Sequence, residues 1–361
     1  MKEILHHTVY EPKPFGHGGE RRVAQIAEIY ESAGIVVNEY KMRCTGFKLK
    51  YLFPFLRQTF SLYGLKMFLR PKTFYKYARY VLTAMPVTVP FFEQSPDVFV
   101  WQSTNEYFQN LCYLAKRNGK RVIAVPHNLE SLVPNSKSGS LEERAPKPFL
   151  REIKILKQCD SVFCISHEET WLLRLFGVNA FYLPYYPARE AEQQMLDIRQ
   201  RRQSVEQSKS LLLVGSALNS PTRTGMQQII DWWKDHAPAG WTLRVGGYHS
   251  DKKLIVPNCE SIVMLGELSQ ERMDDELLHC AAQLIYQPAT TGVLTRIVES
   301  QIAGIPVVAN SLSCRSHYEA RGVYSFDDLS ELEGILSRGI ENPNLPVKPD
   351  YNQFVNAILH G

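Results

Sequence analysis

Short runs of apolar and β-branched residues alternate with amphipathic stretches along the first half of the chain. This alternation is typical of crossover units built around a parallel sheet. The runs predicted as strands are Ile4–Val9, Ile35–Tyr40, Val98–Trp101, Arg121–Val125, Ser161–Ile165 and Ala180–Leu183. Helical spacing falls between them, over Glu20–Ser32, Glu106–Asn118, Pro148–Gln158 and His167–Phe176. The first half is therefore expected to form an α/β domain.

A second series of the same kind follows a polar, charge-dense stretch. Its predicted strands are Leu211–Val214, Thr242–Val245, Ser261–Leu265, Gln283–Tyr286 and Pro306–Ala309. We therefore expect two doubly wound, Rossmann-like domains, residues 1–187 and 210–345, with residues 188–209 as the linker between them. In the tail, residues 346–361, Tyr351–Leu359 has helical spacing and is expected to pack back across the first domain. Because such sheets bind ligands at the carboxyl ends of their strands, the site is expected in a cleft between the two sheets.

Composition narrows the class of protein. The 361 residues are 44% hydrophobic and 22% charged, which excludes a disordered, collagenous or disulfide-scaffold chain. Seven cysteines without a regular framework favour reduced thiols in a cytosolic protein. The first residues contain no apolar stretch long enough for a secretory signal, and no apolar run approaches the ~20 residues of a membrane span. A cytoplasmic location is therefore expected.

The segment Gln287–Asn310 has the strongest chemical pattern. A strand ends near Pro288, a polar loop contains Gly292, and a helix begins near Leu294 and ends at Gly304. The start of a helix offers unpaired N–H groups and a positive dipole end to a phosphate. Arg296 and Glu299 share one helix face, where they could neutralise a diphosphate and accept hydrogen bonds from ribose hydroxyls. The alternative is a surface ion pair, worth at most ~1 kcal/mol.

The same segment resembles the donor-site motif of the family 4 glycosyltransferases. Glu299 matches the second of two acidic residues, and the Gly-x-Pro-Val-Val strand is present from Gly304 to Val308. Thr291 stands where the first acidic residue would be, while Gly292, Arg296 and Glu299 fit a sub-branch with a glycine, a basic residue and a glutamate. The resemblance implies the GT-B fold, in which two Rossmann-like domains face each other, and sugar transfer from a nucleotide donor with retention of configuration.

The resemblance also implies roles for residues elsewhere in the chain. The glycine pair at the start of the first predicted helix would face the donor phosphates, although a tight turn explains it equally well. Ser216 stands where many members have arginine, and Arg223 is the candidate to replace that charge. His127, after a strand, would contact the donor sugar, and we expect it to be catalytic together with Glu299. The implied donor-binding residues are Gly18, Gly19, Gly215, Ser216, Arg223, Thr291, Gly292, Val293, Leu294, Thr295, Arg296 and Glu299.

Residues 41–92 combine basic and aromatic residues without a single acidic one. This mixture is typical of a surface where cations meet lipid phosphates and rings reach the acyl boundary. The alternatives are core aromatics beside solvated lysines, or single-stranded nucleic acid, for which no recognition module is present. The residues expected to form an acceptor or anionic membrane surface are Lys48, Lys50, Arg57, Lys66, Arg70 and Lys72.

The resemblance, together with the basic aromatic segment, implies a peripheral enzyme on the inner face of the membrane. It would transfer a sugar from a nucleoside-diphosphate sugar to a saccharide or lipid-linked saccharide acceptor. The sequence has no Asp-x-Asp motif and no zinc spacing, so neither a metal nor another cofactor is expected. No nucleic-acid partner is expected. A nucleotide-sugar epimerase of the same fold and a non-catalytic sugar-nucleotide-binding scaffold are the alternative functions.

Overall fold

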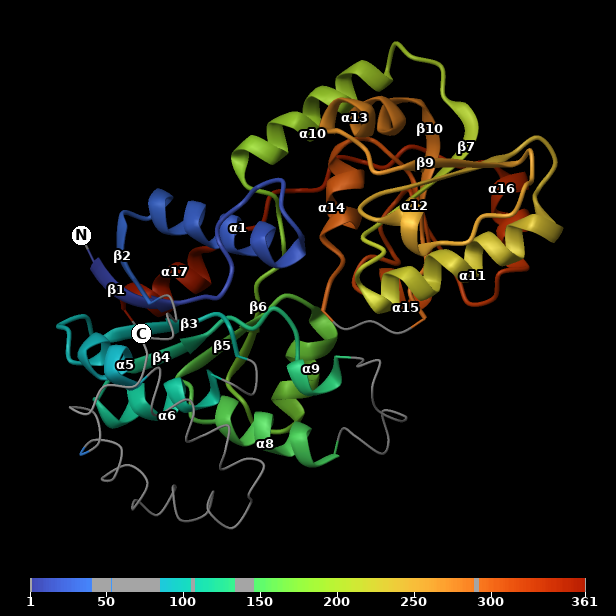
Figure 1. Ribbon diagram of the computed structural model, residues 1–361. Helices are drawn as coiled ribbons and strands as arrows, with labels where there is room; N and C mark the ends of the chain where they lie inside the picture. Colours follow the sequence, from blue (N-terminus) through green and yellow to red (C-terminus); the bar gives the residue numbers. More distant parts are fainter. Residues whose placement is uncertain are drawn as a thin grey trace.

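The computed structural model describes residues 2–40, 53, 85–104, 108–133, 146–288 and 292–360. Within these ranges the chain forms two α/β domains, each built on a six-stranded parallel sheet with helices packed against it (Figure 1). The prediction of two doubly wound domains is confirmed.

The first sheet has the order β2-β1-β3-β4-β5-β6. Its strands are β1 (Lys2–His7), β2 (Ile35–Tyr40), β3 (Val98–Trp101), β4 (Arg121–Ala124), β5 (Ser161–Cys164) and β6 (Ala180–Tyr182). Its helices are α1 (Gly18–Ser32), α5 (Met85–Phe92), α6 (Gln109–Arg117), α8 (Pro146–Leu156) and α9 (His167–Leu175), with the short 3₁₀ helix η3 (Glu130–Leu132). The winding direction reverses between β1 and β3, and ligands bind such sheets outside the carboxyl ends at this point.

The second sheet has the order β12-β11-β10-β7-β8-β9. Its strands are β7 (Ser208–Val214), β8 (Thr242–Gly246), β9 (Ile262–Gly266), β10 (Cys280–Ile285), β11 (Val307–Asn310) and β12 (Val323–Phe326). Its helices are α11 (Ser220–His236), α12 (Ser250–Lys253), α13 (Gln270–His279), α14 (Thr295–Ile302), α15 (Ser311–Cys314) and α16 (Glu331–Arg338). The sequence patterns did not predict β12. Here the winding reverses between β7 and β10, which places the loops before α11 and α14 at the expected ligand edge.

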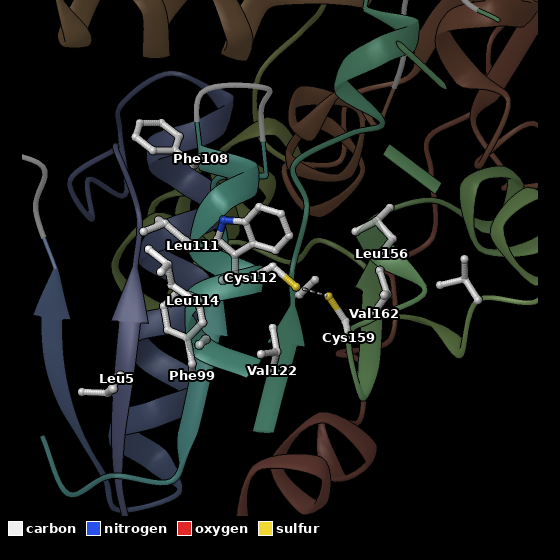
Figure 2. Close-up of a cluster of buried hydrophobic side chains, with 14 of the residues drawn as sticks. Leu5, Phe99, Phe108, Leu111, Cys112, Leu114, Val122, Leu156, Cys159 and Val162 are labelled. Atoms are coloured by element: carbon white, nitrogen blue, oxygen red, sulfur yellow. Dashed lines mark hydrogen bonds between the residues drawn. The ribbon is translucent and has the colours of Figure 1, made fainter. Parts of the chain in front are cut away.

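Apolar residues of the central strands are buried on both faces of each sheet, which is why these strands read as continuous apolar runs. Figure 2 shows one such cluster, in which Phe99 and Val122 of the first sheet pack against α6 residues Leu111 and Leu114. Cys112 and Cys159 lie in this cluster as free thiols, with 3.7 Å between their Sγ atoms.

The expected linker contains helix α10 (Arg189–Arg202), which packs against α13 and α14 of the second domain. Arg199 Nε donates to the carbonyl of Ile302 at 2.8 Å, and Arg202 Nη1 donates to the carbonyl of Leu278 at 2.9 Å. These carbonyls lie at the C-terminal ends of α14 and α13, where a cation is stabilised by the helix dipole. Two arginines of this segment therefore help to hold the second domain together.

The C-terminal helix α17 (Asn352–Leu359) returns to the first domain, where Figure 1 shows it in red among the blue elements. Phe354 and Ile358 are fully buried in the core beneath the first sheet, and the rings of Phe354 and Phe163 meet edge to face at 5.0 Å. Arg121 of β4 donates to the Ile358 carbonyl at 2.7 Å. The chain therefore passes between the domains twice, before α10 and again before α17.

Replacing Phe354 with alanine is expected to lower the free energy of unfolding by about 3 to 5 kcal/mol, because the change leaves a cavity in the first-domain core. Urea unfolding followed by circular dichroism measures the change. Val347→Ala, at a side chain that is 90% exposed, is the control and should change stability by less than about 0.5 kcal/mol. Equal stability of the Phe354→Ala protein and the wild type would show that α17 does not support the first domain.

Candidate functional site

Helices α1 and α14 meet by their N-terminal ends where the two domains come together. His17 caps α1, since its Nδ1 accepts from the amide of Gly19 at 3.2 Å. A Cβ atom placed on Gly18 would lie only 3.8 Å from the side chain of Thr295, the first residue of α14. The start of α14 has no side-chain cap and so presents unpaired N–H groups, and both helix starts carry the positive end of a dipole. The junction is therefore suited to an anion held between the domains.

Glu299 of α14 is the negative charge at this junction, and its side chain is shared by both domains. Tyr185, after β6, donates its hydroxyl to Glu299 Oε1 at 2.7 Å, and Arg21 of α1 donates to Oε2. Burial lowers the pKa of Arg21, but the carboxylate of Glu299 and the neighbouring Tyr185 together outweigh burial and raise the Arg21 pKa above its ordinary value. Burial and the same carboxylate raise the pKa of Tyr185 far above its ordinary value, so its hydroxyl stays a donor.

Arg296 lies one turn before Glu299 and points toward the end of β7. Its Nη1 donates to the carbonyl of Val214 at 2.5 Å, beside the Gly215 turn. A Cβ atom on Gly215 would lie 3.5 Å from the same Nη1 and 2.4 Å from Thr222, so only glycine fits here. Burial, together with the charge of Arg21, lowers the pKa of Arg296 to about 10, which still leaves it cationic at neutral pH. The structure thus brings two cations and one carboxylate together.

The loop around Gly292 is held against the first domain. Gly292 has φ +68°, and a Cβ atom on it would lie 3.0 Å from the carbonyl oxygen of His127. Its amide donates to Glu169 Oε1 at 3.2 Å, and Arg315 donates to its carbonyl. The same Glu169 oxygen accepts from the amide of Leu129 at 3.0 Å. A single carboxylate of α9 therefore joins the loops that follow β4 and β10.

His127 lies at the carboxyl end of the first sheet, with its ring edge to face with Tyr10 at 5.2 Å. Its Nε2 is buried and has no hydrogen-bond partner among the described residues. Burial first, and the nearby charge of Arg22 second, lower the pKa of His127 to about 3. The ring is therefore neutral at physiological pH and suited to orienting a ligand hydroxyl.

Two carboxylates support the loop that follows His127, and a third, Glu130, lies in the loop itself. Glu152 accepts from the amides of Glu130 and Ser131, each at 3.0 Å, and Glu169 accepts from Leu129. Burial first, then repulsion from Glu152 and Glu169, raises the pKa of Glu130 to about 7. Glu130 therefore changes protonation state near neutral pH at the edge of the site.

The remaining predicted residues occupy several positions. Val293 and Leu294 are partly buried behind the Gly292 loop, and a Cβ atom on Gly19 would collide with Tyr10 at 2.7 Å. Ser216 is exposed, and Arg223 donates to the carbonyl of Ala217 at 3.3 Å. The predicted residues that lie outside the described ranges are Lys48, Lys50, Arg57, Lys66, Arg70, Lys72 and Thr291.

Sequence reasoning assigned no role to Arg21, Tyr185 or Glu169. Arg21 follows Gly18 by three positions on the first helix, a spacing that would have placed it one turn from the phosphate-facing end. Nothing in the local pattern distinguishes Tyr185 from its neighbour Tyr186, or Glu169 from Glu168. Their importance comes from contacts between segments that are distant in sequence.

Within the described ranges, no group of three or more histidine, cysteine or acidic side chains is arranged to hold a metal ion. In the same part of the chain no helix is both long and apolar enough to cross a membrane.

A surface cavity of about 560 Å³ lies beside the start of β12. Its lining includes Tyr318, Arg321 and Arg338. Because the cavity lies at the amino end of the second sheet, it is on the opposite side from the junction.

Solved structures of similar fold are glycosyltransferases and related synthases. HepE from Anabaena, in complex with UDP, has a TM-score of 0.58 and 12% identity, covering 94% of this chain and 89% of that one. Sucrose-phosphate synthase from Thermosynechococcus elongatus gives the same values. WaaG, a glycosyltransferase involved in lipopolysaccharide biosynthesis, has a TM-score of 0.51 and 14% identity, covering 93% and 90%. No protein-family model and no curated protein matches the chain. The fold of this chain is therefore GT-B.

Replacing Glu130 with glutamine is expected to stabilise the protein at pH 8. Because the folded-state pKa of about 7 lies above the unfolded value of about 4.3, ionisation of Glu130 costs the wild type up to about 3 kcal/mol above pH 7. This cost disappears as the pH falls through 7 toward 4.3, so the variant and the wild type should converge there. Urea unfolding at pH 4.5, 6 and 8 measures the difference. The exposed Glu333→Gln change is the control, and a Glu130→Gln effect that does not depend on pH would contradict the assignment.

Proposed function

We propose that this protein is a glycosyltransferase that moves a sugar from a nucleoside-diphosphate sugar to a saccharide acceptor. The observation that carries the proposal is the junction of two helix N-termini with Arg21, Arg296 and the buried carboxylate of Glu299. It lies at the carboxyl edges of two sheets of a GT-B fold, a fold shared with HepE, which was solved with UDP. This likeness at 12% identity supports the fold, and the chemistry of the junction supports the substrate class.

In the proposed donor site, the diphosphate lies at the N-terminal end of α14 against the Gly215 turn. Arg296 and the free amides of the helix neutralise its charge. Glu299 accepts hydrogen bonds from ribose hydroxyls. As the bond between the sugar and the diphosphate breaks, negative charge grows on the leaving group, and preorganised cations stabilise it. The proposal therefore needs no metal ion.

The acceptor is proposed to bind at the edge of the first domain. The unpartnered Nε2 of His127 and the carboxylate of Glu130 are the polar groups available there to hydroxyls of the donor sugar or the acceptor. Contacts such as Glu169 to Gly292 close the domains together, which excludes water that would otherwise hydrolyse the donor. Retention of configuration, which the family resemblance implies, is part of the proposal. Of the two alternatives, an epimerase would convert donor without acceptor, and a scaffold would bind donor without turnover.

Titration calorimetry with UDP-, GDP-, dTDP-, ADP- and CMP-sugars, with and without EDTA, tests the donor site. We expect one nucleotide class to bind in the presence of EDTA. Glu299→Gln should weaken that binding about 10- to 100-fold, since a hydrogen bond to a charged group contributes about 1.5 to 3 kcal/mol.

Glu333→Gln, an exposed change in the second domain, is the matched control and should bind like the wild type. Thermal unfolding without ligand checks that the Glu299 variant is folded. Absence of binding by the wild type at millimolar nucleotide sugar, or equal binding by the Glu299 variant, would remove the donor-site assignment.

We further propose that the saccharide acceptor is linked to a lipid. This part of the proposal depends on residues 41–92, which would bind the membrane surface. Cosedimentation with vesicles should show binding that requires anionic lipid and weakens with salt. Replacing Lys48, Lys50 and Lys66 together with glutamine should reduce binding about 100-fold, because each lysine near an anionic surface contributes about 1 kcal/mol.

The matched triple variant Lys209→Gln, Lys234→Gln and Lys252→Gln changes exposed residues of the second domain and should bind vesicles like the wild type. Vesicle binding that depends on neither lipid charge nor ionic strength would count against the proposal that residues 41–92 bind an anionic membrane.

A further inference from the structure

Arg21 is paired with the carboxylate of Glu299. In the proposed function this carboxylate accepts hydrogen bonds from the ribose hydroxyls. The guanidinium of Arg21 reaches across from α1 to Glu299 Oε2, while Tyr185 takes Oε1. Glu299 is only 8% exposed, so these two partners and the surrounding helices cover it. A ribose hydroxyl can reach the carboxylate only if one of the two side chains gives way. Both partners belong to the first domain, but Arg21 is the more exposed of the two, so it is the partner that can leave.

Arg21 is held in a way that allows it to turn without leaving the junction. Its Nε donates to the carbonyl of Gly16 at 2.6 Å, which fixes the base of the guanidinium and leaves the Nη atoms to change partners. A Cβ atom placed on Gly18, at the same helix end, would lie 3.8 Å from Thr295 at the start of α14. The charge of Arg21 also lowers the pKa of Arg296, after burial, which shows that the two cations share one region. A displaced Arg21 would therefore remain next to any diphosphate bound there.

We propose that Arg21 is a positioning residue that exchanges partners when the donor binds. In the empty site it neutralises Glu299, and in the occupied site it pairs with the diphosphate while ribose hydroxyls take its place on the carboxylate. This inference rests on the proposed function. It makes the site selective: a nucleoside without phosphates must displace Arg21 and offers it no new partner, whereas a nucleoside diphosphate supplies one.

The exchange predicts opposite effects of one substitution on two ligands. Arg21→Met keeps an unbranched apolar stem and removes the charged guanidinium, so Glu299 is released and the diphosphate loses a cation. Uridine should bind about tenfold more tightly than to the wild type, and UDP about tenfold more weakly. The ratio of the two dissociation constants should therefore fall about 100-fold. Titration calorimetry measures both dissociation constants. If the panel of nucleotide sugars shows that the protein prefers another base, the nucleoside and nucleoside diphosphate of that base replace uridine and UDP.

Arg21→Lys keeps the charge with a shorter, non-planar group. It should bind uridine more tightly, as the methionine variant does, and should keep most of the UDP affinity. It also serves if the methionine variant proves unstable, as judged by thermal unfolding. Arg117→Met, which removes an exposed arginine at the end of α6, should leave both dissociation constants unchanged.

The outcomes separate this inference from the proposed function. If the wild type binds UDP and both Arg21 variants weaken uridine and UDP by the same factor, Arg21 only supports the fold and the exchange is wrong. If the variants weaken UDP without any gain for uridine, Arg21 contacts phosphate but does not cover the ribose position. If the wild type binds neither UDP nor any other nucleotide of the panel, the proposed function and the exchange both fail.

Discussion

The buried carboxylate of Glu299 lies where the contact between the two domains and the proposed ligand site coincide. Two helix N-termini and the cations Arg21 and Arg296 lie close together where α1 meets α14, and without compensation these positive groups would repel one another. The carboxylate of Glu299 compensates them and at the same time accepts from Tyr185. Without a ligand, this carboxylate therefore links the two domains through its hydrogen bonds to Arg21 and Tyr185. In the proposed function the same carboxylate binds the ligand, so domain contact and ligand binding use the same atoms.

Most of the fold could be predicted because buried parallel strands leave a direct trace in the sequence. Strands such as Val98–Trp101 are apolar at every position, since both faces are covered by helices. The edge strand β12 was missed because Tyr324 and Ser325 face less buried surroundings and interrupt the apolar run. Helix α10 was expected to be a polar linker, because the carbonyls that its arginines bind at the ends of α13 and α14 cannot be seen from the sequence.

The candidate site was only partly predictable. The residues that were predicted lie close together in the sequence, whereas those that were missed make contacts with distant segments. Gly292, Arg296 and Glu299 lie within eight residues of one another, so their proximity follows from one loop and the first turns of one helix. Arg21 pairs with Glu299 across 278 positions, and Glu169 reaches Gly292 across 123. No local pattern encodes such contacts. They appear only when two separately wound sheets are brought together, and they determine how the predicted residues are held.

The return of α17 to the first domain has a consequence for how the chain folds during synthesis. Phe354 and Ile358 complete the core beneath β1 and β3, yet the ribosome adds them only after every strand and helix of the second domain. The first half emerges early with an open apolar face and must wait for the whole second domain to be made. Nascent chains of this protein therefore have a long period in which the first sheet is incomplete, and a chaperone that shields apolar surface would act on the first domain during that period.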